Sequence, residues 1–379
     1  MRYKIWIGKR ESDILTYKFF DYSITFYGSN KNINSSFSNE YRQKSSYSDD
    51  FTVFVINNLN TIYRKYQDIE IHFYSGIFAN RIIAKCPSYK KSIVNTNSIF
   101  LLNNLRHKTL SRVWLNNSVS VPSFTLLSKD ECNIDYLGTK FDGYSSFVIQ
   151  KNYSGGGAGT YLMNNHNEST VINKLNENEL YLVSPFYFPS QSLSCHILID
   201  KNDCVVFPVS EQMIYSQKDN LEYVGNRYLS NESPISLLIK ESAFSIGNKL
   251  KNIGYRGICG FDYIYYNGEV FLVEINPRYQ GSSYILNYAL KKYQLPSLFE
   301  LNTMCFNGEI PNRIKSAINS LKVNYINNYI VYHDYNDLIK AKDIKSNKIN
   351  MIFSDGYENA LRFEKGCYLF RYMLPCDEF

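Results

Sequence analysis

The sequence predicts a mixed α/β protein built from about two or three packed units. The chain has 379 residues, which is more than a single hydrophobic core usually organises. Near the N-terminus, short β-branched and aromatic runs are separated by intervals of helical length. Further along, two glycine-containing turns each join a pair of strand-like segments, and an amphipathic helix lies between the two pairs.

The first unit is expected over residues 1–100. Residues 2–8, 50–57 and 69–74 are rich in β-branched and aromatic residues and are predicted to be strands. Residues 29–50 are rich in Ser, Asn and Tyr, which predicts a long surface loop. Strands separated by intervals of helical length predict an α/β domain here.

The second unit is expected over residues 101–185. Residues 101–116 have helical spacing, and the helix is expected to stop before Pro122. Residues 141–162 predict a strand, a glycine loop and a second strand.

A third unit is expected over residues 186–325. It contains a predicted hairpin turn at Asn202-Asp203, a helix over 233–253, and a hairpin closed by Asn267-Gly268. The tail, residues 326–379, is turn-rich and strand-like, which predicts a strand-rich C-terminal appendage.

The composition is that of a folded chain with a small excess of positive charge. Hydrophobic residues make up 44%, and 34 Tyr and 24 Phe exclude a disordered protein. The net charge is +6 and no block of Lys and Arg stands out, so we expect no nucleic-acid and no membrane partner. The start holds no apolar run of signal-peptide length, and runs such as 51–56 cannot span a bilayer, so we expect a cytoplasmic protein.

The cysteines and histidines show no metal-binding or nucleophile pattern. The eight cysteines form no CxxC pair, and we expect free thiols in a reducing compartment. The five histidines show no HxxxH spacing. Cys195 and His196 are adjacent, so an extended strand would point them to opposite faces. We therefore expect neither a zinc site nor a Cys–His pair.

The glycine loop follows Lys151, which ends the apolar run FVIQK and precedes NYSGGGAGT. Glycines let the backbone approach a phosphate closely, and a strand-end lysine adds a point charge for phosphate oxygens. The pattern is not a P-loop, because a second strand-like segment follows instead of a helix. A flexible hairpin tip stays open as the alternative.

The last predicted hairpin carries Asp262 on one strand and Glu274 and Asn276 on the other. Glu274 and Asn276 are two residues apart and so share a face. Two carboxylates and an amide oxygen are ligands that magnesium–nucleotide sites use. A two-residue turn would pair Asp262 with Val273, whereas a three-residue turn or a bulge would pair it with Glu274.

The alternative for each carboxylate is a solvated strand position. Asp262 in GFDYIYY and Glu274 in FLVEI have apolar neighbours, however, and a lone carboxylate there is costly unless it is paired or metal-bound. Arg278 follows Pro277 and is expected to reach a phosphate or a substrate carboxylate. The sequence therefore favours a metal site at this hairpin.

These segments together resemble the ATP-grasp superfamily of carboxylate–amine ligases. Its members carry a strand-end lysine with a glycine-rich loop, here Lys151 with residues 154–159, and a G-x-D…E-x-N-P-R hairpin, here 260–262 with 274–278. RHKTLSRVWLNNSVSVPSF resembles the superfamily's lysine and helix before the nucleotide-binding region, and QGSS at 280–283 resembles its amide-forming branches. The matches cover about residues 100–290. They imply a Rossmann-like N-terminal domain and two lobes that clasp ATP.

The resemblance also implies a role for each matching residue. Arg278 and Lys151 would act in catalysis, and Asp262, Glu274 and Asn276 would hold Mg²⁺. The hinge YLVSPFY, at 181–187, has Ser184-Pro185 where related enzymes usually have a glutamate. The residues expected to bind ATP are Lys108, Lys151, Ser154, Gly155, Gly156, Gly157, Gly159, Ser184 and Phe186. Those expected to bind substrate are Glu211, Arg278, Gly281 and Ser282.

The reaction implied by the resemblance activates a carboxylate as an acyl phosphate, joins it to an amine, and releases ADP and phosphate. The expected partners are small-molecule or peptide carboxylates and amines, and a homodimer is compatible with the sequence. Two alternatives stay open. One is a ligase with a thiol or bicarbonate acceptor, for which His166 and His196 are the phosphohistidine candidates, and the other is a non-catalytic ATP- or peptide-binding scaffold.

Overall fold

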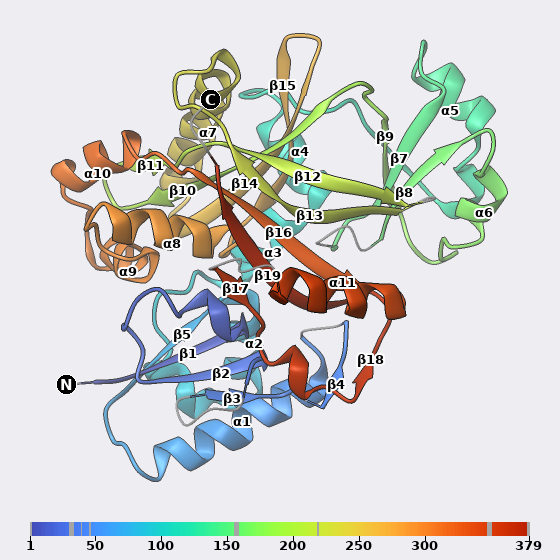
Figure 1. Cartoon of the computed structure of the whole chain (residues 1–379). Helices are drawn as coiled ribbons and strands as arrows, with labels where there is room; N and C mark the ends of the chain where they lie inside the picture. Colours follow the sequence, from blue (N-terminus) through green and yellow to red (C-terminus); the bar gives the residue numbers. More distant parts are fainter. Residues whose placement is uncertain are drawn as a thin grey trace.

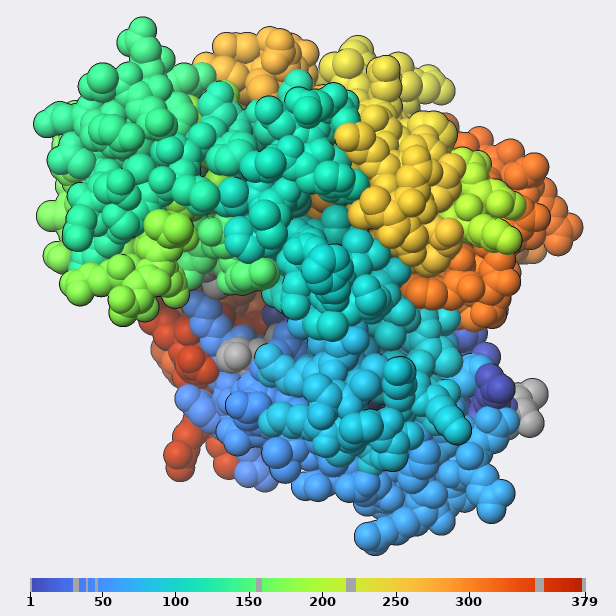
Figure 2. All heavy atoms as spheres, turned by 180° about the vertical axis from the view of Figure 1, so that it is seen from behind, coloured from blue at the N-terminus to red at the C-terminus, as the bar shows by residue number. Residues whose placement is uncertain are grey.

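The computed structural model describes residues 2–29, 34–38, 40–44, 47–154, 159–217, 220–346 and 351–376. They form an N-terminal unit, a small lobe and a large lobe (Figure 1). Seen from behind, the small lobe overhangs the N-terminal unit, and the surface is hollowed between them (Figure 2). Short 3₁₀ turns lie at Glu11–Asp13, Pro87–Lys91, Lys129–Glu131 and Tyr357–Asn359.

The N-terminal unit is a parallel sheet with helices packed on it, which agrees with the predicted α/β domain. Its strands lie in the order β3-β2-β1-β5, and each pairing is parallel. The carboxyl ends of β1 and β5 therefore lie at the same edge of the sheet. The elements are β1 (Tyr3–Arg10), β2 (Tyr22–Tyr27), β3 (Asn34–Ser36), β4 (Tyr41–Arg42), α1 (Asp49–Tyr63), β5 (Ile69–Phe73) and α2 (Gly76–Lys85).

The prediction of a strand over residues 50–57 is wrong, because this segment belongs to helix α1. The side chain of Ser48 accepts a hydrogen bond from the N–H of Phe51 and caps the helix. Apolar spacing of three to four residues continues past the predicted strand and outweighs the local β propensity. The buried apolar residues of this helix are Phe51, Val55, Leu59 and Ile62.

The prediction of a surface loop over residues 29–50 needs correction as well. Its described residues include β3 and β4, and Asn34 and Ser36 are buried. Asn34 Oδ1 accepts a hydrogen bond from Ser23 Oγ (2.8 Å), and Asn34 Nδ2 donates to Ser36 Oγ (3.0 Å). These polar side chains are buried because they satisfy one another, which composition alone does not reveal.

The small lobe and the helices before it follow the predicted pattern with one difference. The helix predicted at 101–116 is two helices, because His107 ends the first and its side chain accepts from the N–H of Leu110 to cap the second. The strands lie in the order β6-β9-β7-β8, all antiparallel. The elements are α3 (Ile99–Arg106), α4 (Lys108–Leu115), β6 (Thr125–Leu127), α5 (Ile134–Lys140), β7 (Ser146–Lys151), β8 (Thr160–Asn164), α6 (Glu168–Ile172) and β9 (Tyr181–Pro185).

The large lobe is built on a sheet with the order β15-β14-β10-β12-β13-β16-β19-β17, and β11 pairs with β10. Helix α7 packs against β10 and β11, as its amphipathic spacing predicts. The elements are β10 (Gln191–Ile199), β11 (Cys204–Val206), β12 (Ser210–Gln217), β13 (Asn220–Tyr228), α7 (Pro234–Asn252), β14 (Gly257–Tyr266), β15 (Glu269–Asn276), α8 (Ser283–Lys292), α9 (Leu298–Asn307) and α10 (Asn312–Asn319).

The tail contains a helix as well as strands, and it connects two parts of the molecule. β16 and β19 extend the large sheet, while β18 pairs with β4 of the N-terminal unit. Helix α11 was not predicted, since its polar and apolar residues are poorly separated into faces. The elements are β16 (Tyr325–Tyr332), α11 (Tyr335–Ser346), β17 (Ile352–Phe353), β18 (Arg362–Phe363) and β19 (Cys367–Pro375). The domain boundaries at residues 100, 185 and 325 stay predictions.

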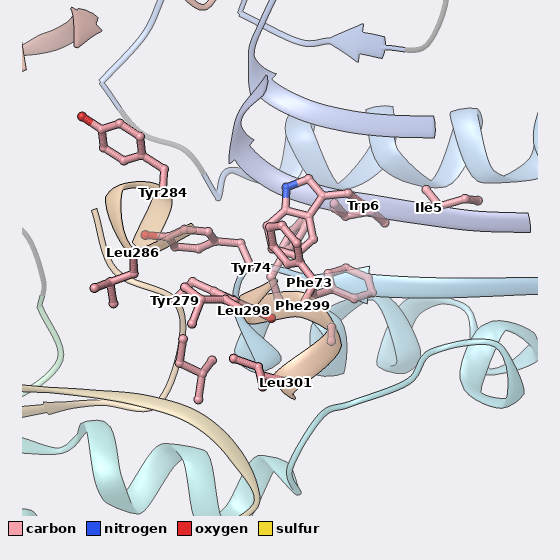
Figure 3. Close-up of a cluster of buried hydrophobic side chains, with 14 of the residues drawn as sticks. Ile5, Trp6, Phe73, Tyr74, Tyr279, Tyr284, Leu286, Leu298, Phe299 and Leu301 are labelled. Carbon is pink, nitrogen blue, oxygen red and sulfur yellow. The ribbon is translucent and has the colours of Figure 1, made fainter. Parts of the chain in front are cut away.

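An aromatic core joins the N-terminal unit to the large lobe (Figure 3). Trp6 of β1 packs edge-on against Tyr279 (ring centroids 5.4 Å apart) and against Phe299 of α9 (5.0 Å). Each such ring removes roughly 150–250 Å² from water on burial. Because Tyr279 follows the β14–β15 hairpin directly, this core fixes the hairpin's end against β1.

All eight cysteines are free, as predicted. In the part of the chain that the structure describes, no helix has the length and apolar character that crossing a bilayer requires.

Asp200 ties the turn between β10 and β11 to the start of α10. Its Oδ1 accepts from the N–H groups of Asn202 (2.8 Å) and Asp203 (2.7 Å). Its Oδ2 accepts from the N–H of Ile310 (2.9 Å) and from Lys315 Nζ (2.8 Å). Burial raises the pKa of Asp200, but the Lys315 ammonium and the backbone donors outweigh it, so the pKa lies below its ordinary value.

We expect Asp200→Asn to lower the free energy of unfolding by about 2–4 kcal/mol at pH 7, because buried donors lose their acceptor. A depressed carboxyl pKa gives stability that is present above the unfolded pKa, about 4, and is lost as pH falls through the folded value. The deficit should therefore shrink below about pH 4. Urea unfolding at several pH values measures it, with the half-exposed Asp203→Asn as control; equal stability of Asp200→Asn and wild type at pH 7 contradicts this role.

Candidate active site

The β14–β15 hairpin presents the three predicted metal ligands on one face. Asn267-Gly268 form a two-residue turn with φ of 48° and 86°, which alone would pair Asp262 with Val273. A bulge shifts the register between Asp262 and the next residue, so that Asp262 pairs with Glu274. Asn276, two residues after Glu274, lies on the same face. The hairpin thus adopts the bulged register that a metal site requires.

Asp262 lies among amide side chains. Its Oδ1 accepts from Gln212 Nε2 (3.0 Å) and Gln280 Nε2 (3.2 Å), and its Oδ2 accepts from Asn276 Nδ2 (2.7 Å). Burial, followed by the charge of Glu274, raises the pKa of Asp262 to about 6. A carboxylate that has neutral donors and a second carboxylate beside it is stabilised by a cation.

Lys108 connects this hairpin to the start of the glycine loop. Its side chain is buried, and Nζ donates to the carbonyl oxygen and to Oγ of Ser154, both at 3.0 Å. The same Nζ lies 3.8 Å from Glu274 Oε2. Burial lowers the pKa of Lys108, and the charge of Glu274 opposes that effect. The ammonium is therefore held between the glycine loop and the carboxylates.

Arg112 lies one helical turn after Lys108 on α4 and was not among the predicted site residues. It is buried, and both Nε and Nη2 lie 3.4 Å from the carbonyl oxygen of Val273, the bulged residue. Nη1 donates to Ser184 Oγ (2.9 Å), and Nη2 donates to Gln150 Oε1 (3.2 Å). Arg112 thus joins the bulge to β9 and β7 of the small lobe. The one sequence signal for Arg112 is that it follows Lys108 by four residues, which puts both side chains on the same face of a helix.

Arg278 follows the hairpin and stands between it and the N-terminal unit. Nη2 donates to Asn276 Oδ1 (3.0 Å), Nη1 donates to the carbonyl oxygen of Tyr279 (2.9 Å), and the backbone forms a β-bridge with Ser75 after β5. Burial lowers the pKa of Arg278, but Tyr74 and Glu274 raise it and prevail. The guanidinium therefore stays charged beside Asn276.

Lys151 lies at the end of β7, as predicted, and forms a 2.7 Å ion pair with Glu179 instead of joining the carboxylates. Ser154 Oγ donates to the carbonyl oxygen of Lys151 (3.2 Å). Gly159 has a φ of 70°, and a Cβ there would lie 2.9 Å from the Lys151 stem, so this position requires glycine. Gly155, Gly156 and Gly157 lie outside the described residues.

The structure turns Glu211 away from Asp262, and its substrate role stays a prediction. It pairs with Leu193 on β10, and its carboxylate forms a 2.6 Å ion pair with Arg227 across β13. Gln212, its neighbour on β12, points to the opposite face and donates to Asp262. Gln212 and not Glu211 therefore lies at the carboxylate cluster, since adjacent strand residues alternate between faces.

The remaining predicted residues flank this cluster. Ser184 is buried under Arg112, and the N–H of Phe186 donates to the carbonyl oxygen of Ser146 (2.8 Å), so it is not free to contact a ligand. Gly281 accepts a hydrogen bond from the Tyr329 hydroxyl (2.6 Å), and Ser282 is buried just before α8. The nucleotide role of Ser184 and Phe186 and the substrate role of Gly281 and Ser282 stay predictions.

The residues at the hairpin fit a divalent cation. No group of three or more His, Cys, Asp or Glu side chains is clustered for a metal in the described ranges. The proposed ligand set does not need one, because it consists of two carboxylates and one amide with other positions left to water and phosphate. Burial, followed by the charge of Glu274, raises the pKa of Asp262, and a cation bound by both carboxylates would oppose both effects.

Comparisons with known proteins agree with this architecture. The family model for the ATP-grasp domain matches residues 106–282, which include Lys108, the glycine loop and the hairpin. A search of curated protein sequences finds no match.

Solved structures of similar fold cover nearly the whole chain. N5-carboxyaminoimidazole synthetase from Staphylococcus aureus, complexed with ADP, is 15% identical with a TM-score of 0.65, over 100% of this chain and 95% of that one. L-amino acid ligase from Bacillus licheniformis is 9% identical with a TM-score of 0.63, over 99% and 94%. The biotin carboxylase domain of Hydrogenobacter thermophilus 2-oxoglutarate carboxylase is 13% identical with a TM-score of 0.62, over 88% and 76%.

At these identities the solved structures establish the fold, and the family model matches the part of the chain that carries the lysine, the glycine loop and the hairpin. Both confirm the fold class and the resemblance that the lysine, glycine-loop and hairpin motifs predict. The chain therefore has the ATP-grasp fold, and its residues 106–282 match the model of the ATP-grasp domain.

Proposed function

We propose that the protein is an ATP-dependent ligase that activates a carboxylate as an acyl phosphate and joins it to an amine. The observation that carries this proposal is the bulged hairpin, which sets Asp262 beside Glu274 with Lys108 and Arg278 next to them. ATP and Mg²⁺ are the proposed cofactors, with the nucleotide between the small and large lobes. A pure scaffold would have no need for this complete set.

The first step would be attack of the substrate carboxylate on the γ-phosphate of ATP, with ADP as leaving group. Phosphoryl transfer depends mainly on positioning and on offsetting the charge that builds up on the phosphate oxygens. Lys108 would contribute here, because its ammonium would exchange Ser154 for a phosphate oxygen while it stays near Glu274. Lys151 would likewise exchange its partly exposed partner Glu179 for a phosphate oxygen.

Asp262, Glu274 and Asn276 would hold Mg²⁺, which supplies charge neutralisation on the phosphates when bound. In the second step an amine would attack the acyl phosphate and expel phosphate through a tetrahedral intermediate. Arg278 would donate to the oxyanion of that intermediate. The small lobe and the glycine loop would exclude water, which otherwise hydrolyses the acyl phosphate.

A second candidate is activation of bicarbonate in place of an organic carboxylate. The observation in its favour is the fold similarity to a biotin carboxylase domain whose structure holds MgADP and bicarbonate. A phosphohistidine route to a thiol acceptor has less support. His196 is buried, its Nε2 lies 2.9 Å from Ser283 Oγ, and burial followed by the charge of Arg278 lowers its pKa to about 3. His166 is exposed in a turn.

The test is formation of ADP and phosphate from ATP and Mg²⁺, screened over amino acids, peptides and bicarbonate, each with and without added amines. We expect turnover that requires a carboxylate and rises at least about 10-fold with the matching amine. Without an amine, the acyl phosphate would be consumed only by slow hydrolysis, whereas a bound amine is positioned to attack it. Turnover that requires bicarbonate alone would favour the second candidate. Nucleotide binding with no carboxylate-dependent turnover across the screen would contradict the ligase proposal.

A further inference from the structure

Two adjacent cations, Lys9 and Arg10, end strand β1 at the carboxyl edge of the parallel sheet. As neighbours on a strand they point to opposite faces, so an anion that contacts both has to lie beyond the end of the strand. Ligands of open parallel sheets bind outside this edge. Arg278 reaches the same place, because its backbone forms a bridge with Ser75 directly after the neighbouring strand β5.

Neither cation has a hydrogen-bond acceptor or an ion-pair partner within the described ranges of the chain. Arg10 is only 7% exposed, and its Nε is buried without a partner. Its guanidinium lies 4.3 Å from the ring centre of Tyr368 and 5.1 Å from that of Tyr329. Burying a cation without an oxygen acceptor is unfavourable, and the two rings offset that cost only in part.

The neighbouring arginines differ from these two cations. Arg371 pairs with Asp13 at 2.8 Å, and Arg42 Nη2 donates to the carbonyl oxygens of Ser354 and Asp355. Arg42 Nε and Nη1 and Arg371 Nε are buried without a partner as well, so these two arginines are satisfied only in part. Each nevertheless has an oxygen acceptor, whereas no acceptor lies at Lys9 or Arg10 among the described residues.

The nearby carboxylates are already engaged. Glu11 accepts from the N–H and Oγ of Ser29, both at 2.8 Å, and Asp355 accepts from Ser12 and from the Tyr368 hydroxyl. Asp13 is bound to Arg371, and its Oδ2 is buried without a partner. The region between β1 and Arg278 therefore has an excess of positive charge.

The titration of Lys9 agrees with this excess. Burial, followed by the charges of Arg10 and Arg278, lowers the pKa of Lys9 to about 7, and Asp13 opposes the shift. The pairing of β1 with β5 runs up to Ile7 and Phe73, and Ser75, two residues further on, forms the bridge with Arg278, so the end of β1 and Arg278 flank the end of β5. An anion bound among the three cations would offset their mutual repulsion.

We propose that Lys9 and Arg10 form an anion subsite that binds a second carboxylate or a phosphate of the substrate activated beside Arg278. The substrate class is therefore a dicarboxylate or a phosphorylated carboxylate. This inference deepens the proposed function and rests on it for the identity of the reacting group. The subsite itself rests on the unpartnered cations alone.

The first experiment measures anion binding without catalysis. Sodium succinate and sodium phosphate are titrated separately into the full chain by calorimetry in chloride buffer. We expect at least one anion to bind, Lys9→Met to weaken that binding about 10- to 100-fold, and Lys9→Arg to retain most of it. Lys4→Met, at the other end of β1, should bind as wild type does. The anion that binds with the higher affinity shows whether the subsite recognises a carboxylate or a phosphate.

Three results would overturn the subsite: no binding of either anion, equal binding by wild type and Lys9→Met, or binding that depends on Lys151 and not on Lys9. The last would place the anion at the proposed nucleotide site. Lys9 is partly exposed, so its variants should fold, and Arg10→Lys gives an independent variant that keeps the charge. Circular dichroism checks the fold of each.

The second experiment measures selectivity in turnover. Wild type should prefer glutamate over glutamine, or O-phosphoserine over serine, by at least about 10-fold in kcat/KM, and Lys9→Met should remove that preference. Turnover with no charge preference would overturn the inference while leaving the ligase proposal intact. Anion binding that depends on Lys9, without turnover on any substrate, would leave the subsite standing and contradict the proposed ligase.

Discussion

Asp262→Asn is expected to lower ATP turnover by at least about 10³-fold while the fold survives. The substitution removes one of two carboxylates from the proposed cation site, and a loss of this size corresponds to about 4 kcal/mol of transition-state stabilisation. The amide is nearly isosteric, and Gln212, Gln280 and Asn276 can reorient to hydrogen-bond with it. Steady-state ADP formation at saturating ATP and Mg²⁺ measures the effect.

Glu269→Gln is the matched control, because Glu269 is an exposed carboxylate on the same hairpin, next to the turn. Its turnover should stay within about twofold of wild type, as expected for a surface change away from the site. Glu274→Gln should behave like Asp262→Asn. If either of these two variants kept wild-type turnover with unchanged thermal stability, the assignment of the carboxylates to a metal would be wrong.

Arg112→Met is expected to lower the free energy of unfolding by about 3–5 kcal/mol and to impair catalysis as well. The side chain lies within reach of the bulge carbonyl of Val273, Ser184 and Gln150, and these buried groups would lose their donor. Without that donor the bulge can relax toward the regular register, which turns Glu274 to the other face. Arg112 is a positioning residue, since it acts through Glu274.

The relevant measurements are urea unfolding and the KM for Mg²⁺ and for ATP. Arg112→Met should raise the KM for Mg²⁺ by at least about 10-fold and raise the KM for ATP much less, which loss of stability alone would not produce. Arg64→Met, an exposed arginine after α1, should change neither quantity. If Arg112→Met lowered the free energy of unfolding but left the KM for Mg²⁺ unchanged, the role of Arg112 would be structural only.

The turn and the ligands of the hairpin could be predicted from the sequence, but the bulge could not. Asn267-Gly268 is a strong local signal for a two-residue turn, and that turn alone separates Asp262 from Glu274. The bulge is supported by Arg112, which comes from a helix about 160 residues earlier in the chain. Such a contact leaves no local pattern in the hairpin itself.

The same limit explains the other differences between sequence and structure. Residues 50–57 have the composition of a strand, and only the wider spacing of apolar residues over α1 and the Ser48 cap favour a helix. Arg10 has the sequence context of an ordinary strand end, and only the fold brings the rings of Tyr329 and Tyr368 from the tail against its guanidinium. Glu211 and Gln212 are adjacent, and their faces follow from strand pairing across β10, which the sequence does not specify.

The most direct test of the central claim is a crystal structure with a non-hydrolysable ATP analogue and Mn²⁺, using the anomalous signal of manganese to place the metal. The claim predicts a manganese peak within about 2.5 Å of oxygens from Asp262, Glu274 and Asn276, next to the analogue's terminal phosphates. A nucleotide bound between the lobes with its metal held elsewhere, or with Asp262 still hydrogen-bonded to amides alone, would contradict it.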